Sequence, residues 1–61
     1  MKNYKLTVFE ANGEKLLDET FQAAADQEAK QIGEKMLSEK NYLDKTHRCT
    51  SPSGKLVLFH A

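Results

Sequence analysis

His47, Cys49 and His60 are the residues of this chain whose types could do chemistry. Strand alternation places all three on one face of a hairpin predicted from residues 45–50 and 55–60. Imidazole and thiolate groups bind zinc, but a tetrahedral site needs four ligands, or three and a water. A fourth protein ligand is missing and apolar side chains lie among the candidates. We therefore interpret Cys49 as a small core residue and His60 as a residue at the end of the last strand, and we predict no metal or other cofactor.

The same residues are an alternative candidate for a cysteine nucleophile with a histidine base. Residues two apart on one strand are about 6.5 Å distant, which exceeds hydrogen-bond reach. No orienting acid is evident, and Gly13, Gly33 and Gly54 are too isolated to form a phosphate-binding loop. We expect this protein not to be an enzyme.

Basic residues gather around the second hairpin: Lys45, His47, Arg48 and Lys55. With aromatic neighbours they could contact phosphates and stack on bases, which makes a nucleic-acid-binding module one hypothesis. The alternative is a solvated hairpin edge, where lysine discourages strand-to-strand aggregation. Nine basic and nine acidic side chains cancel, unlike the net basic charge of most nucleic-acid binders.

The elements that must position these residues are two hairpins and one helix. Tyr4 to Glu10 alternates as a strand, and Asn12-Gly13 predicts a two-residue type I′ turn. This loop sets the pairs Ala11–Glu14, Phe9–Leu16, Val8–Leu17, Leu6–Glu19 and Tyr4–Phe21. Because Glu19 falls on the apolar face of its strand, we expect its carboxylate to reach solvent at a sheet edge.

A helix is predicted from about Ala24 to Lys40, with Asp26 as a cap or in the first turn. Its apolar stripe is Ala25, Ala29, Ile32 and Met36, with Gly33 and Leu37 at the margin. Gly33 indicates a close approach of the helix to the sheet, and Asn41 is a left-handed stop.

The second hairpin has a four-residue loop, Ser51 to Gly54. Its predicted pairs are Thr50–Lys55, Cys49–Leu56, Arg48–Val57, His47–Leu58 and Thr46–Phe59. The chain is thus a single small α+β domain, residues 1–61, of ββαββ order: a four-stranded, largely antiparallel sheet with one helix packed on one face. The strand order stays open, because the hairpins can meet along either edge. The expected core is Tyr4, Leu6, Val8, Leu17, Phe21, Ala29, Ile32, Met36, Cys49, Leu56 and Leu58.

One helix covers only one face of a four-stranded sheet, yet apolar side chains fall on the opposite face in both hairpins. They are Phe9, Leu16, Val57 and Phe59, and they form one patch if the hairpins are neighbours. Exposed patches of this kind mark interaction sites. The first hypothesis is therefore a non-catalytic interaction module that binds itself, as a homodimer, or another protein through the open sheet face. The alternatives are a register error that exchanges the faces, or scattered exposed residues.

The composition favours a cytoplasmic protein. Cys49 is the only cysteine, so no disulfide forms within the chain. Met1-Lys2-Asn3-Tyr4 leads into a strand pattern without a secretion signal, and no apolar run approaches the ~20 residues that cross a bilayer.

Four segments resemble the short YhzD-like proteins of Bacillus and relatives: residues 6–10 (LTVFE), 28–30 (EAK), 46–49 (THRC) and 54–60 (GKLVLFH). The resemblance covers nearly the whole chain. It implies a small cytoplasmic protein of a Gram-positive bacterium. That family has no assigned function, so it implies no catalytic or binding residue.

Overall fold

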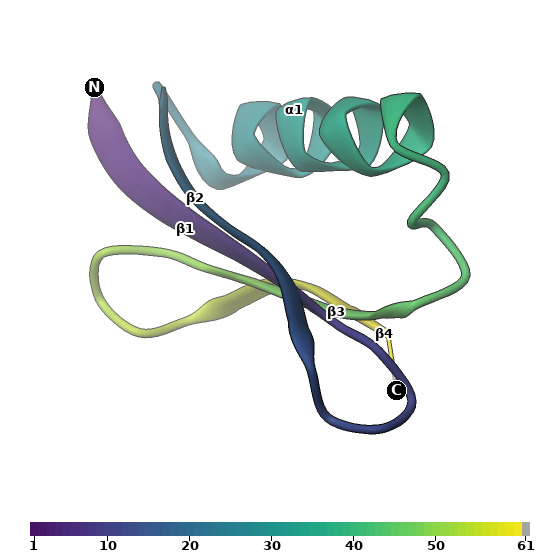
Figure 1. Ribbon diagram of the computed structural model, residues 1–61. Helices are drawn as coiled ribbons and strands as arrows, with labels where there is room; N and C mark the ends of the chain where they lie inside the picture. Colours follow the sequence, from purple (N-terminus) through teal and green to yellow (C-terminus); the bar gives the residue numbers. More distant parts are fainter. Residues whose placement is uncertain (61) are drawn as a thin grey trace.

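A computed structural model describes residues 1–60, which form two hairpins joined by one helix. The elements are β1 (Lys2–Phe9), β2 (Lys15–Ala23), α1 (Asp26–Glu39), β3 (Thr46–Thr50) and β4 (Leu56–His60). All neighbouring strands are antiparallel, and α1 lies on one side of the sheet (Figure 1). This confirms the predicted α+β, ββαββ fold. Within residues 1–60, no helix combines the length and the apolar character that a membrane span requires.

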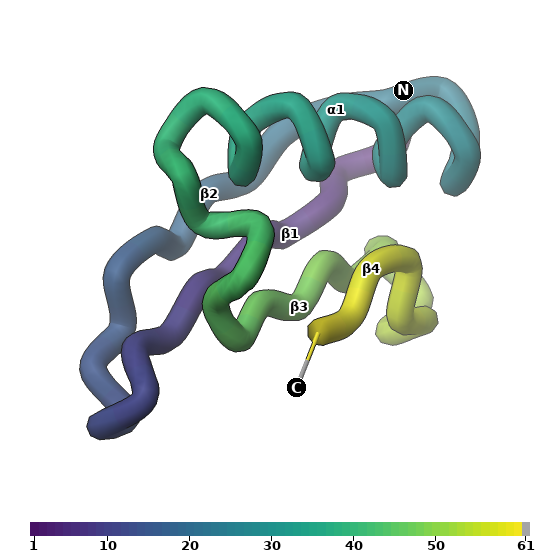
Figure 2. The backbone as a smooth tube through the Cα atoms, turned by 90° about the vertical axis from the view of Figure 1, so that its right-hand side faces the viewer, coloured from purple at the N-terminus to yellow at the C-terminus, as the bar shows by residue number. Residues whose placement is uncertain are grey.

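The strand order is β2-β1-β3-β4, so the two hairpins meet through β1 and β3. Since β1 separates β2 from β3, the helix carries the chain across the sheet from an outer strand to an inner one (Figure 2). The inner strands supply the fully buried Tyr4, Leu6, Val8 and Cys49. Glu19 lies on the outer strand β2 and is exposed, as expected of a carboxylate on that face.

Both hairpins close with the same three-residue loop. In the first, Glu10 N–H donates to Glu14 O at 2.7 Å and Gly13 N–H donates to Glu10 O at 2.8 Å. In the second, Ser51 and Gly54 make the equivalent bonds, each at 2.9 Å. Gly13 and Gly54 have φ of +92° and +88°, the conformation of a type I turn followed by a G1 bulge. The predicted type I′ turn and the predicted four-residue loop are therefore wrong.

Each hairpin then carries an extra residue in its second strand, Leu16 in β2 and Val57 in β4. In the first hairpin Phe9 consequently pairs with Lys15 instead of Leu16, whereas the expected pairs from Val8–Leu17 onward are confirmed. In the second hairpin the register moves by two residues, so Arg48 pairs with Phe59. A shift of two preserves which face a side chain occupies.

Leu56 is the exception: it precedes the bulge, so it does not lie on the face that was predicted for it. It pairs with Thr50 and is 48% exposed. The expectation that Leu56 joins the core beside Cys49 is therefore wrong.

The two hairpins are related by an approximate two-fold axis perpendicular to the sheet. Gly13 corresponds to Gly54 and Leu16 to Val57, and the pairing of β1 with β3 is centred on Thr7 and Arg48. The axis therefore passes between these two residues.

The helix begins without a side-chain cap. Ala25 is the N-cap residue, and Asp26, the first helical residue, accepts a hydrogen bond from Tyr4 Oη instead. Glu28 turns back and accepts the N–H of Ala24 at 2.8 Å. At the other end Asn41 has φ of 59°, and the N–H groups of Asn41 and Tyr42 bond to the carbonyls of Ser38 and Leu37, which completes a Schellman motif. The predicted stop at Asn41 is confirmed.

The buried line of the helix is Ala29, Gly33 and Leu37, rotated slightly from the predicted stripe. Ile32 and Met36 flank it and are partly buried. Gly33 makes the predicted close approach to the sheet, since a Cβ atom there would lie 2.8 Å from Leu58 Cδ1. The fully or nearly fully buried core is Tyr4, Leu6, Val8, Ala23, Ala29, Leu37, Cys49 and Leu58. Leu17 and Phe21 pack against it while partly exposed.

Candidate interaction surface

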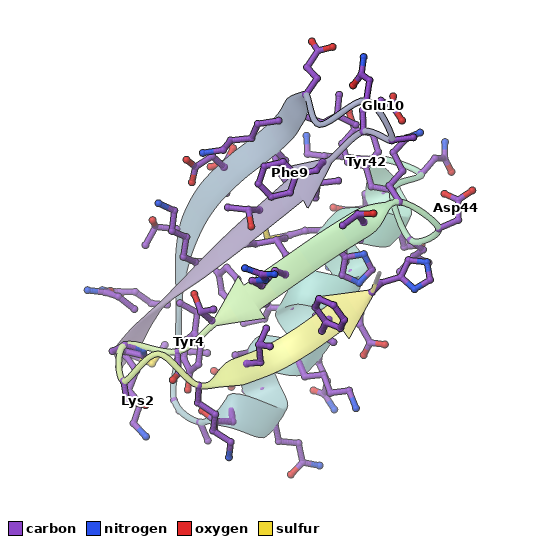
Figure 3. The ribbon with its side chains drawn as sticks, turned by 90° about the horizontal axis from the view of Figure 1, so that it is seen from below. Lys2, Tyr4, Phe9, Glu10, Tyr42 and Asp44 are labelled. Atoms are coloured by element: carbon purple, nitrogen blue, oxygen red, sulfur yellow. The ribbon has the colours of Figure 1, made fainter. Side chains whose placement is uncertain are left out.

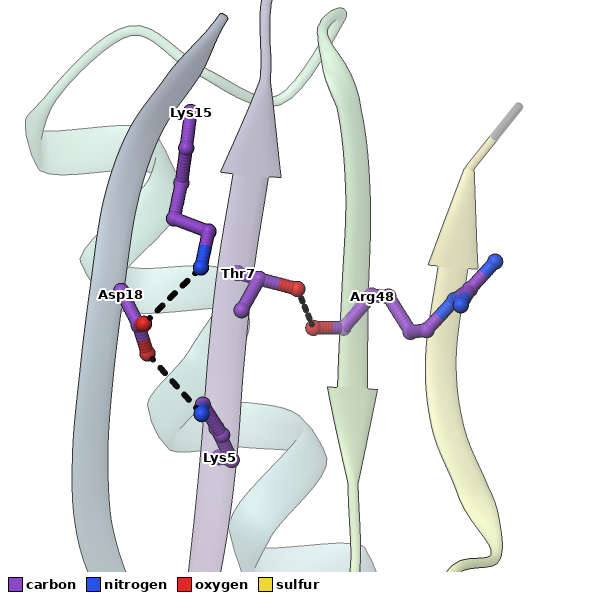
Figure 4. A network of polar contacts seen from close by, with 5 residues as sticks. All are labelled: Lys5, Thr7, Lys15, Asp18 and Arg48. Carbon is purple, nitrogen blue, oxygen red and sulfur yellow. Dashed lines mark hydrogen bonds and ion pairs between the residues drawn. The ribbon is translucent and has the colours of Figure 1, made fainter. Parts of the chain in front are cut away.

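The face of the sheet opposite α1 is open, and one row of side chains crosses all four strands of it. Asp18 of β2 pairs with Thr7 of β1, Thr7 with Arg48 of β3, and Arg48 with Phe59 of β4. Thr7 Oγ1 donates to the Arg48 carbonyl at 3.3 Å and ties the two inner strands together (Figure 4). The row therefore runs from an acid on one outer strand to an aromatic ring on the other.

Asp18 lies between two lysines at the acidic end of this row. Lys15 Nζ is 3.1 Å and Lys5 Nζ 3.5 Å from its carboxylate oxygens (Figure 4). The hydrogen bond from Lys15, aided by the charge of Lys5, lowers the pKa of Asp18. All three side chains are well exposed, so the cluster is a solvated network that keeps this corner polar.

Arg48 and Phe59 form the other end of the row. The guanidinium carbon of Arg48 is 5.8 Å from the centroid of the Phe59 ring, a cation–π contact. Figure 4 shows the Arg48 side chain reaching from β3 across to β4. None of the ion pairs found within residues 1–60 includes Arg48. Phe59 itself is 56% exposed, so an aromatic ring and a cation both face solvent here.

The four apolar side chains predicted for this face fall into two groups. Only Phe59 is exposed, whereas Phe9, Leu16 and Val57 are partly buried and the last two also pack against the core. Phe9, which faces the viewer in Figure 3 with the helix behind the sheet, lies beside Leu16 on β1 and β2. Val57 and Phe59 lie on β4 with the exposed Leu56. We call these the Phe9 patch (Phe9, Leu16) and the Phe59 patch (Leu56, Val57, Phe59). The β3 residues on this face, Thr46, Arg48 and Thr50, separate the two patches.

The four basic residues predicted to contact nucleic acid do not share a surface. His47 is only 6% exposed and lies on the helix side of the sheet, opposite Arg48. Lys45 pairs with Glu10 at 2.8 Å, and Lys55 pairs with Asp26 at 3.4 Å. Only Arg48 belongs to the open face.

His47 and His60 do come together, whereas Cys49 stays apart in the core. The two imidazole rings stack at 5.5 Å, and His47 Nδ1 donates to the Lys45 carbonyl at 2.9 Å. Burial raises the pKa of the Cys49 thiol to about 11. Across residues 1–60, no three His, Cys, Asp or Glu side chains converge in a way that could hold a metal ion.

Sequence reasoning missed the contact between Tyr4 and Asp26, because the two residues are far apart in sequence and neither carries a local signal of the contact. Tyr4 Oη donates to Asp26 Oδ1 at 2.6 Å. This hydrogen bond, with burial, raises the pKa of Tyr4 to about 12 and lowers that of Asp26. The contact fixes the start of α1 on β1, and Lys55 joins the hairpin loop before β4 to the same carboxylate.

Comparison with known proteins places the chain in one family. The family described as "YhzD-like protein" matches residues 1–61. The chain belongs to the YhzD-like family. A curated relative, "Uncharacterized protein YhzD" of Bacillus subtilis (strain 168), is 45% identical over 60 residues, which cover 98% of each chain. No solved structure matches this YhzD-like chain. The resemblance seen in the sequence is thereby confirmed over the whole length.

Proposed function

We propose that this YhzD-like chain is a non-catalytic interaction module that associates with a second copy of itself through the open sheet face. The observation that carries the proposal is Phe59, a large aromatic side chain that is 56% exposed on that face, on the outer strand β4. Leu56, two paired positions away on the same face of β4, is 48% exposed, so a second large apolar side chain on this strand faces solvent. Aromatic residues and arginine are the types most enriched at protein interfaces, and here Arg48 lies over Phe59.

The size and charge of the molecule suit a second copy. The two longest dimensions of the whole molecule are 33 and 22 Å, so one broad side of it is on the order of the ~800 Å² per partner that stable interfaces bury. The formal net charge is zero, so no net repulsion opposes the approach of two copies.

A non-catalytic role is supported by the state of the one thiol. The Cys49 side chain is fully buried and its pKa is raised to about 11, so the thiol is protonated at neutral pH and is a poor nucleophile. The cytoplasmic location and the absence of cofactors stay predictions.

The nucleic-acid alternative has weaker support. Of its four proposed contacts, His47 is buried, and Lys45 and Lys55 are engaged by carboxylates. Salt separates the two functions, because phosphate-dominated binding weakens steeply with salt whereas apolar association does not.

Sedimentation velocity over a range of concentrations tests the proposal. The wild type is expected to shift from monomer to dimer as concentration rises, and Phe59→Ser is expected to stay monomeric. Leu43→Ser is the matched control: Leu43 is 49% exposed but lies before β3, outside the open face. A wild type that is monomeric at high micromolar concentration would refute self-association, and binding of a labelled single-stranded oligonucleotide would favour the alternative.

A further inference from the structure

Each of the two apolar patches on the open face contains the bulge residue of one hairpin. Leu16 and Val57 are the bulge residues of the two hairpins and correspond to each other under the approximate two-fold axis between Thr7 and Arg48. Leu16 and Val57 therefore lie on opposite sides of the centre of the face, at similar distances from it, and each patch extends from one of them. Between them the surface is formed by threonines and Arg48.

A face with two equidistant patches can be self-complementary. In a two-fold symmetric interface, if one patch of the first copy contacts another patch of the second copy, the same contact forms with the roles of the two copies exchanged. Consider a two-fold axis that lies in the interface, passes over the point between Thr7 and Arg48, and runs between the two patches. Such an axis can place the Phe9 patch of each copy on the Phe59 patch of the other. Two identical apolar contacts result, with the polar centre between them.

Arg48 decides between this arrangement and its competitor. An axis that ran through both patches would lay each patch on its own counterpart. Because the Arg48 guanidinium lies over Phe59, that arrangement would bring the two Arg48 side chains of the dimer together, and like charges at an interface are costly. Exchanging the patches separates the two cations and sets each Arg48 against the Phe9 ring of the other copy, an aromatic partner of the kind it already has in Phe59.

We infer that two copies pack through their open faces with the patches exchanged, Phe9 and Leu16 of each copy against Val57 and Phe59 of the other. This inference rests on the proposed self-association and adds its orientation and its contacts. Because the inference names which side chains meet, opposite charges introduced at those positions can test it.

The test is a complementation experiment with Phe9→Lys and Phe59→Glu. Each variant alone carries a charge opposite an apolar ring in both contacts of its dimer, so each is expected to dimerise at least about tenfold more weakly than the wild type. An equimolar mixture is expected to form a heterodimer, because one contact keeps both phenylalanines and the other pairs the new lysine with the new glutamate. Native mass spectrometry distinguishes the heterodimer by mass, and sedimentation gives its Kd.

Leu16→Lys and Val57→Glu form a second pair for the same contacts and cover the case in which a Phe9 variant does not fold, which circular dichroism reports. If the wild type dimerises but neither mixture recovers a heterodimer, the exchanged arrangement is refuted while self-association stands. Single variants that dimerise as tightly as the wild type would also refute the exchanged contacts. A monomeric wild type would refute the proposed function and this inference together.

Discussion

Gly33 of α1 lies directly against Leu58 of β4. A Cβ atom added to Gly33 would be 2.8 Å from Leu58 Cδ1 and 4.0 Å from the Phe21 ring. Leu58 and Phe21 belong to the two outer strands, so the helix rests on side chains that converge from both edges of the sheet. The missing side chain at residue 33 thus sets how closely the helix and the sheet approach.

Gly33→Ala is expected to destabilise the protein although alanine is the better helix former. The exchange gains about 1 kcal/mol of helix propensity. Overpacking of a filled core costs about 1–3 kcal/mol, and Leu58 is buried, so the net expectation is a loss of up to about 2 kcal/mol in urea unfolding. In a Leu58→Val background the obstructing methyl is gone and the same substitution should become neutral or stabilising.

Ser38→Ala is the control for this cycle, because Ser38 is an exposed residue of the same helix. It should gain a few tenths of a kcal/mol in both backgrounds. Equal effects of Gly33→Ala with and without Leu58 would show that the contact is not what excludes a side chain.

The Tyr4–Asp26 hydrogen bond predicts a loss of stability at alkaline pH. The pKa of Tyr4 rises from 10.0 to about 12 on folding, so the folded state holds the phenol proton more tightly than the unfolded chain does. This contribution is complete below pH 10.0 and is lost as pH rises through about 12. In a Tyr42→Phe variant the remaining phenol should titrate near 12 by ultraviolet difference absorbance.

Asp26→Asn removes the charge that holds this proton. The pKa of Tyr4 should then fall toward its ordinary value of 10.0, and the alkaline loss of stability that begins near pH 10.0 should become smaller and end at a lower pH. A Tyr4 titration unchanged by Asp26→Asn would rule out the carboxylate as the main cause.

The left-handed residue that ends α1 predicts opposite effects for two substitutions. Asn41 has φ of 59°, a conformation that costs most residues with a Cβ about 1–2 kcal/mol, costs asparagine less and costs glycine nothing. Asn41→Gly should therefore stabilise slightly, by a few tenths of a kcal/mol, and Asn41→Ala should cost about 1 kcal/mol in thermal or urea unfolding. Equal stabilities of the two variants would show that the Schellman motif does not constrain this position.

The order of the elements could be predicted from the sequence because its signals are local. Alternation marks each strand, and Asn41 ends the helix where its type indicates. The order of the strands stayed open in the sequence, but the expectation that Glu19 reaches solvent at a sheet edge agrees with β2 being an outer strand. What the pattern did not contain was which strand of the second hairpin joins β1.

The registers were predicted less well, and this altered the candidate surface. Both loops hold glycine at the last position of a type I turn, which is the signal for a G1 bulge, but Asn12-Gly13 was interpreted as a type I′ turn. In the second hairpin, the three-residue loop and the bulge at Val57 each move the register by one residue, which brings Phe59 beside Arg48. The separation of the two patches depends on pairing between β1 and β3, which lie far apart in sequence, and no local pattern encodes it.

The equivalence of the two hairpins predicts equal costs for one substitution made in each. Gly13 and Gly54 have nearly the same φ, and a Cβ atom at either would meet nothing within 4 Å. Gly13→Ala and Gly54→Ala should therefore each cost about 1 kcal/mol from backbone strain alone, and the double variant should lose the sum, since the loops share no contacts. Asparagine, which tolerates this conformation better, should cost less at both positions. Urea unfolding of the four single variants and the double variant measures this, and a cost of several kcal/mol at only one loop would show that the hairpins are not equivalent in energy.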